Sequence, residues 1–177
     1  MGHFSVSAIG RDRPGIVAAI AAGLVGIGAN IEDSRMTILG GHFAVMLLVS
    51  TPDEYDGAAV EAALADAREV LELEALTVSE VGAGADARPA ADHVITVYGS
   101  DHPGIVHAIT AELAEAGIGI TDLQTRLAGD RSSPLYVMML EVALGDADAA
   151  DLDERLSRVA EAAVVEVEMR PLEAEAL

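Results

Sequence analysis

The sequence predicts an α+β protein of two similar domains, each a four-stranded antiparallel sheet with two helices on one face. Three observations predict it. The segment Gly10–Val17 (GRDRPGIV) recurs as Gly99–Val106 (GSDHPGIV), so one module is present twice. In each copy, strand-like and helix-like apolar patterns follow the order β-α-β-β-α-β. A small-residue stretch containing proline, Gly82–Asp92, separates the copies.

The repeat also sets the expected domain limits. A shift of 89 positions aligns Gly10–Asp33 with Gly99–Asp122, and 13 of these 24 pairs are identical. The match resumes at Phe43–Leu47 and Tyr136–Leu140, after four extra residues in the second copy. A chain of 177 residues is long enough for two domains of about 80 residues each. We expect domain 1 over 1–81, a linker over 82–92 and domain 2 over 93–177.

The first strand and helix of each copy follow from local signals. Short strands are expected over His3–Ile9 and His93–Tyr98. The first helix is expected to begin at a proline, which has no N–H and suits the first helical position. An aspartate two residues earlier is expected to cap the helix, and a glycine to end it. These residues are Asp12, Pro14 and Gly28 in copy one, and Asp101, Pro103 and Gly117 in copy two.

One face of the first helix is expected to be buried, because its apolar residues recur at spacings of one, three and four. They are Ile16, Val17, Ile20 and Leu24, repeated as Ile105, Val106, Ile109 and Leu113. A hairpin follows, turning at Gly40-Gly41 in copy one and over Ala128–Pro134 in copy two.

A second helix and a closing strand complete each copy. The helix is predicted from Val60, Leu64, Ala67 and Leu71, and from Leu152, Leu156, Val159 and Ala163. The closing strand of copy two alternates Val165, Val167 and Met169 with charged residues. This βαββαβ order is the ferredoxin-like arrangement.

Composition narrows the function classes. The formal charge is −20 and lysine is absent, so direct binding to nucleic acid or to anionic membranes is not expected. No apolar run reaches the length of a membrane span, and Met1–Ser5 does not resemble a signal peptide, so a cytoplasmic location is expected. The absence of cysteine excludes thiolate chemistry.

At the repeated turn the sequence resembles a tandem pair of ACT domains. The signature D-x-P-G-I-V is present at Asp12–Val17 and at Asp101–Val106. The second signature, G-x-N-I, is present at Gly28–Ile31 and becomes Gly-Ile-Gly-Ile at Gly117–Ile120. A pair without an attached enzyme resembles the regulators of the glycine cleavage system. The run Asn30–Met36 and the following Leu39–Ala44 fit that subgroup.

The resemblance implies a small regulatory protein that binds amino acids at interfaces between ACT sheets and forms homodimers. In that subgroup it also implies control of a transcription factor through protein contact. Carried over by motif, the candidate ligand residues are Asp12, Arg13, Pro14, Gly15, Ile16, Val17, Asn30 and Ile31, and in copy two Asp101, His102, Pro103, Gly104, Ile105 and Val106. Gly119 replaces the asparagine in copy two, so domain 1 is the stronger candidate.

Structural interpretations of the same residues remain open. The Asp-x-Pro-Gly turn can serve only to start a helix, although free amides there also suit a carboxylate. Asn30 can hold a turn, and Arg11 and Arg13 can be surface charges. The acidic stretch Asp146–Glu154 can be a solvated face or a docking surface for a basic partner.

No catalytic, metal or cofactor site is expected. The five histidines form no i, i+4 pair, no G-x-S-x-G motif is present, and without lysine a P-loop is excluded. We therefore expect a non-catalytic regulator that binds a small amino acid, with glycine or serine suggested by the resemblance. The alternative is a ligand-independent module that docks a transcription factor or an enzyme.

Overall fold

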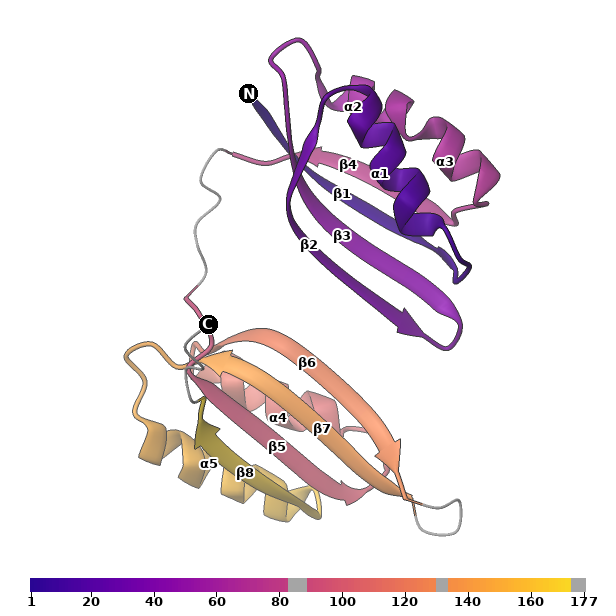
Figure 1. Ribbon diagram of the computed structural model, residues 1–177. Helices are drawn as coiled ribbons and strands as arrows, with labels where there is room; N and C mark the ends of the chain where they lie inside the picture. Colours follow the sequence, from indigo (N-terminus) through magenta and orange to yellow (C-terminus); the bar gives the residue numbers. More distant parts are fainter. Residues whose placement is uncertain (83–88, 130–133, 173–177) are drawn as a thin grey trace. The chain divides into compact units, whose positions relative to one another are not determined.

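The computed structural model describes residues 1–82, 89–129 and 134–172. The chain divides into two units, Met1–Ala87 and Arg88–Leu177, here called domain 1 and domain 2. Each is a four-stranded antiparallel sheet with its helices on one face (Figure 1), which confirms the predicted α+β, ferredoxin-like class. Parts of the expected linker (83–88) and of the second hairpin turn (130–133) lie outside the described residues.

Domain 1 follows the predicted order, except that its second helix is divided. Its elements are β1 (Gly2–Arg11), α1 (Ile16–Gly26), β2 (Asn30–Leu39), β3 (His42–Thr51), α2 (Gly57–Ala63), α3 (Ala65–Val70) and β4 (Ala75–Glu80). The strand order in the sheet is β2-β3-β1-β4. Gly40 and Gly41, both at positive φ, make the predicted turn between β2 and β3.

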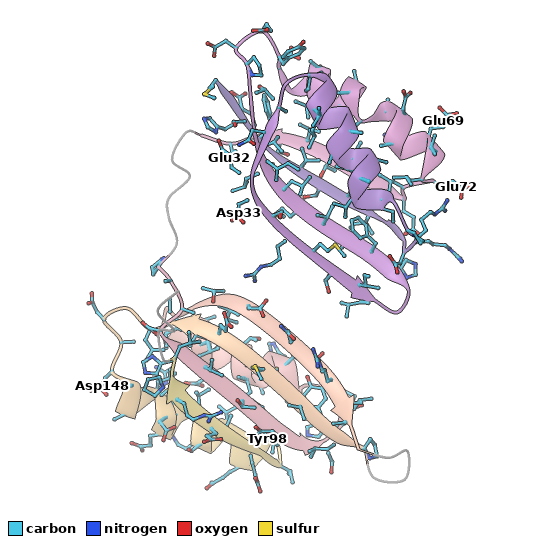
Figure 2. The ribbon with its side chains drawn as sticks, viewed as in Figure 1. Glu32, Asp33, Glu69, Glu72, Tyr98 and Asp148 are labelled. Carbon is cyan, nitrogen blue, oxygen red and sulfur yellow. The ribbon has the colours of Figure 1, made fainter. Side chains whose placement is uncertain are left out.

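Domain 2 repeats this arrangement. Its elements are β5 (His93–Ser100), α4 (Ile105–Glu115), β6 (Gly119–Ala128), β7 (Leu135–Ala143), α5 (Ala149–Ala162) and β8 (Val165–Pro171), with the sheet order β6-β7-β5-β8. Asp148 caps α5 by accepting hydrogen bonds from the Ala150 and Asp151 amides (Figure 2).

Each domain has its own apolar core between sheet and helices. In domain 1 the α1 face contributes Ile16, Ile20 and Leu24, which pack on alternate residues of β1 and β3. In domain 2 their counterparts are Ile105, Ile109 and Leu113. The predicted apolar spacing of the first helix is thus confirmed, with one exception. Val17 and Val106 are 50% and 39% exposed, so placing them in the core was wrong.

The first helix ends where the sequence predicts but starts later. Its predicted end is confirmed, because Gly28 and Gly117 take positive φ just after α1 and α4. Its predicted start is wrong. Both helices begin two residues after the proline, and the glycine between the proline and the helix is the N-cap, in the left-handed region. No aspartate side chain caps either helix.

The second helix of domain 1 was predicted as one helix, and the structure corrects this. Buried Leu64 stands between α2 and α3, whereas α5 is continuous at the equivalent position. At the junction α1 approaches α2 closely. A Cβ added to Gly23 would lie 2.5 Å from the carbonyl oxygen of Ala63. Domain 2 has Glu112 in place of Gly23, and its carboxylate pairs with Arg155 of α5.

Strands β2 and β6 each contain a bulge that the sequence did not predict. The register shifts at Glu32 in β2 and at Thr121 in β6. Without the bulge Ile31 and Met36, five positions apart, would face opposite sides of the sheet. With it, both lie on the helix-covered side, where they pair with Val49 and Val45.

Asp92 ties the start of domain 2 to its sheet. Its main chain bonds to Val142 and Leu172, and its side chain accepts a hydrogen bond from the Leu144 amide at 3.0 Å. The carboxylate also lies 2.8 Å from Nδ1 of His93. The Leu144 amide, and then the His93 ring, hold the pKa of the Asp92 carboxyl below its ordinary value of 3.8.

Asp92→Asn is expected to lower the unfolding free energy of domain 2 at pH 7 by at most about 1 kcal/mol, because the side chain is partly exposed. A carboxyl with a lowered folded-state pKa stabilises the fold above its unfolded pKa, and that contribution is lost as the pH falls through the folded value. The difference from wild type should therefore begin to shrink near pH 3.8 and disappear as the pH falls through the lower folded-state pKa. Urea titrations between pH 7 and pH 3 measure it, with Asp146→Asn as the control that changes nothing.

Candidate functional site

The Asp-x-Pro-Gly turn of domain 1 joins β1 to α1 and is held by backbone bonds. The Asp12 amide donates to the Gly41 carbonyl at 2.9 Å, which fixes the turn against the β2–β3 hairpin. Gly15 has φ +95°, a conformation that glycine adopts without strain, and nothing lies within 4 Å of a Cβ placed there. No side chain accepts the amides of the first turn of α1. An external acceptor can therefore approach this helix terminus.

A hollow of about 210 Å³ lies beside this turn. We call it the domain 1 pocket. Its lining comes from the turn, the start of α1, the edge strand β2 and the core strand β3: Asp12, Arg13, Gly15, Ile16, Val17, Ala18, Met36 and Phe43. Five of the predicted site residues are therefore brought together. Val17 and Met36 are each 50% exposed, and Phe43 is buried.

Arg13 is held by an ion pair. Its guanidinium donates to the Glu72 carboxylate at 2.9 Å, and Glu72 projects from the turn after α3 (Figure 2). The hydrogen bond from Arg13 holds the pKa of the Glu72 carboxyl below its ordinary range. Glu72 adopts a positive φ of 51°. Arg13 thus connects the rim of the pocket to the turn that leads into β4.

His102 makes the equivalent connection in domain 2. Its Nε2 lies 2.7 Å from the Ala163 carbonyl oxygen and its Nδ1 lies 3.2 Å from that of Pro103. The next residue, Val164, has a positive φ of 52°, as Glu72 does in domain 1. In both copies the variable residue of Asp-x-Pro-Gly therefore ties the first turn to the end of the last helix.

Two residues that line the domain 1 pocket have different counterparts in domain 2. Phe43 and Met36 are replaced in domain 2 by Tyr136 and Thr125, which each carry a hydroxyl group. Burial, and then the charge of Asp101, raises the pKa of the Tyr136 hydroxyl. Two other predicted site residues of copy two have the same structural roles as their counterparts in domain 1. Gly104 is the N-cap of α4, and Ile105 lies in the core.

Asn30 and Ile31 lie away from the pocket. Asn30 opens β2 and pairs with Ser50, whereas Met36 lies near the hairpin end of the same strand. Asn30 is exposed, and Ile31 is 37% exposed. Within one domain the structure therefore does not bring the G-x-N-I motif to the Asp-x-Pro-Gly turn.

Met36, Phe43 and Ala18 are pocket residues that sequence reasoning missed. The alternation of β2 and β3 assigns Met36 and Phe43 to the helix-covered side. That signal shows which side of a sheet a residue faces, but it does not show whether a helix leaves a gap there.

The described residues contain no cluster of three or more metal-binding side chains. Three of the five histidines lie beside a carboxylate instead: His3 by Glu32, His42 by Glu74 and His93 by Asp92. Among the described helices, none has the length and apolarity needed to cross a bilayer.

Two ferredoxin-like domains, each with the same turn at the start of its first helix, define a tandem-repeat architecture. The family model described as ACT domain matches residues 3–77 and 92–170. The chain belongs to the ACT domain family.

Relatives that span most of the chain support this assignment. The glycine cleavage system transcriptional repressor of Escherichia coli (strain K12) is 28% identical over 159 residues, covering 86% of this chain and 80% of that protein. The Shigella flexneri protein of the same name matches equally. A crystal structure of an unknown protein from Galdieria sulphuraria is 32% identical, with a TM-score of 0.82, and covers 97% of this chain and 98% of that one. The named relatives are repressors rather than enzymes, in agreement with the non-catalytic role predicted from the sequence.

Proposed function

We propose that this protein is a non-catalytic regulator that binds a small amino acid in the domain 1 pocket. The observation that carries this proposal is the pocket itself, which opens beside uncapped backbone amides at the start of α1. Such amides, together with the positive end of the helix dipole, favour a carboxylate. The carboxylate of Asp12, which also lines the pocket, suits an ammonium group. Both charged groups of an amino acid thus have a counterpart.

A second copy of the chain completes the site in this proposal. All ten residues of the edge strand β2 are exposed, and they include Ile31, Met36, Ile38 and Leu39. An edge strand with exposed apolar residues favours pairing with another strand. Two β2 strands pairing antiparallel about a two-fold axis would bring Asn30 of one copy towards the hairpin end of the other, where the pocket lies. An asparagine there can both donate to and accept from the ligand.

The ligand would act by shifting an equilibrium between association states, because it binds only where two copies meet. The relatives named as transcriptional repressors support an effect on gene expression, and we propose that the protein acts in the cytoplasm. The charge of −20 disfavours direct contact with DNA, so we propose that the effect passes through another protein.

Asn30→Ala is expected to weaken amino-acid binding about tenfold or more, since a hydrogen bond to a charged group contributes about 1.5–3 kcal/mol. Isothermal titration calorimetry against the twenty amino acids measures it. The matched control is Ser79→Ala, on the opposite edge strand β4, which should bind as wild type does. Unchanged affinity in Asn30→Ala would remove Asn30 from the site, and no binding below millimolar by the wild type would refute the ligand role altogether.

The alternative function, a ligand-independent docking module, makes the opposite prediction about partners. A partner protein retained equally with and without amino acids in a pull-down would favour the docking module. Release or capture that depends on the amino acid would favour the regulator.

A further inference from the structure

The apolar side chains that line the domain 1 pocket indicate which amino acids it prefers. This inference rests on the proposed function. Asp12 and Arg13 lie on the turn, but the remainder of the side-chain lining is apolar. Phe43 lies at the bottom with only 1% of its surface exposed, and Val17 and Met36 form the sides, each half exposed. None of these three side chains carries a strong hydrogen-bond donor or acceptor.

Domain 2 has polar residues at the positions equivalent to two of these apolar residues. Tyr136 and Thr125 occupy the positions of Phe43 and Met36, and each carries a hydroxyl group. The register confirms the equivalence, because Met36 pairs with Val45 and Thr125 with Met138. The fold therefore accepts a polar pair at these positions, and the apolar pair in domain 1 is not required by the architecture.

We infer that the domain 1 pocket selects amino acids with an apolar side chain over glycine and serine, and that Met36 and Phe43 determine this specificity. Glycine leaves the exposed surfaces of Val17 and Met36 uncovered, so it gains nothing from them. The serine hydroxyl loses water against this wall and finds no partner on it. An aliphatic side chain covers the wall, and each methylene removed from water raises affinity about fourfold.

Calorimetric titration of the full-length protein with glycine, serine, alanine, valine, leucine and methionine tests the inference. Valine or leucine is expected to bind at least about tenfold more tightly than glycine or serine. Glycine or serine binding as tightly as leucine would overturn the specificity but leave the proposed function standing. If no amino acid binds, the proposed function itself fails.

Exchanging the apolar pair of domain 1 for the polar pair of domain 2 tests whether Met36 and Phe43 determine specificity. Met36→Thr with Phe43→Tyr, which copies domain 2, should reduce the preference for leucine over serine about tenfold. The matched control, Thr125→Met with Tyr136→Phe in domain 2, should keep the wild-type preference. If the first double variant does not fold, Met36→Thr alone serves, because this side chain is half exposed. An unchanged preference in the folded variant would show that the wall does not determine specificity.

Discussion

Gly23→Ala is expected to destabilise domain 1 by about 3 kcal/mol, because the new methyl group would meet backbone that has little room to move. The added Cβ would lie 2.5 Å from the Ala63 carbonyl oxygen and 3.1 Å from Cδ2 of Leu64. Ala63 ends α2, so relieving the contact requires moving a whole helix away from α1. Urea unfolding of the full chain measures the loss.

The matched control for Gly23→Ala is on the same helix. Gly26 has nothing within 4 Å of an added Cβ, so Gly26→Ala should be neutral or should stabilise by up to about 1 kcal/mol through helix propensity. A loss of similar size in both variants would mean that steric contact with α2 is not the cause.

Leu156→Ala is expected to cost domain 2 about 3 kcal/mol, because Leu156 is fully buried in a core between α5 and the sheet. The two domains have separate cores, so the stability of domain 1 should not change. Hydrogen exchange followed by mass spectrometry resolves the two, since peptides report on each domain separately.

The control is Leu127→Ala in β6, where the leucine is 61% exposed and the expected loss is below about 0.5 kcal/mol. Faster exchange throughout domain 1 in Leu156→Ala would contradict the independence of the two cores.

The fold could be predicted from the sequence because its signals are local and occur twice. The spacing of Ile16, Ile20 and Leu24 sets a helix face, and Gly40-Gly41 permits only a tight hairpin. The departures from prediction depend on tertiary contacts. Val17 shares the apolar pattern, but it lies one position past Ile16, about 100° round the helix from the buried stripe, and it lines the pocket instead.

Two further errors have the same kind of origin. Gly15 takes the left-handed conformation and becomes the N-cap, so the helix starts later than Pro14 and the Asp12 side chain does not cap it. The break at Leu64 accompanies the close approach of Gly23 to α2, which depends on residues 40 positions apart. Neither the late start of α1 nor the break at Leu64 can be predicted from a short window of sequence.

The candidate site was only partly predictable. The turn Asp12–Val17 was found by its motif, and the structure places it beside a pocket. The position of Asn30 also follows from topology: β1 and β2 both run antiparallel to β3, so the end of β1 and the start of β2 lie at opposite ends of the sheet. The motifs alone do not show that these two segments lie apart within one domain.

The central claim is that the domain 1 pocket is the amino-acid site. Nuclear magnetic resonance of methyl groups during titration with leucine tests it most directly. Signals from Val17 and Met36 are expected to shift with a single saturable affinity, whereas those from Val106 and Met138 in domain 2 should stay in place. Shifts confined to domain 2, or calorimetric binding that leaves Val17 and Met36 unchanged, would contradict the claim.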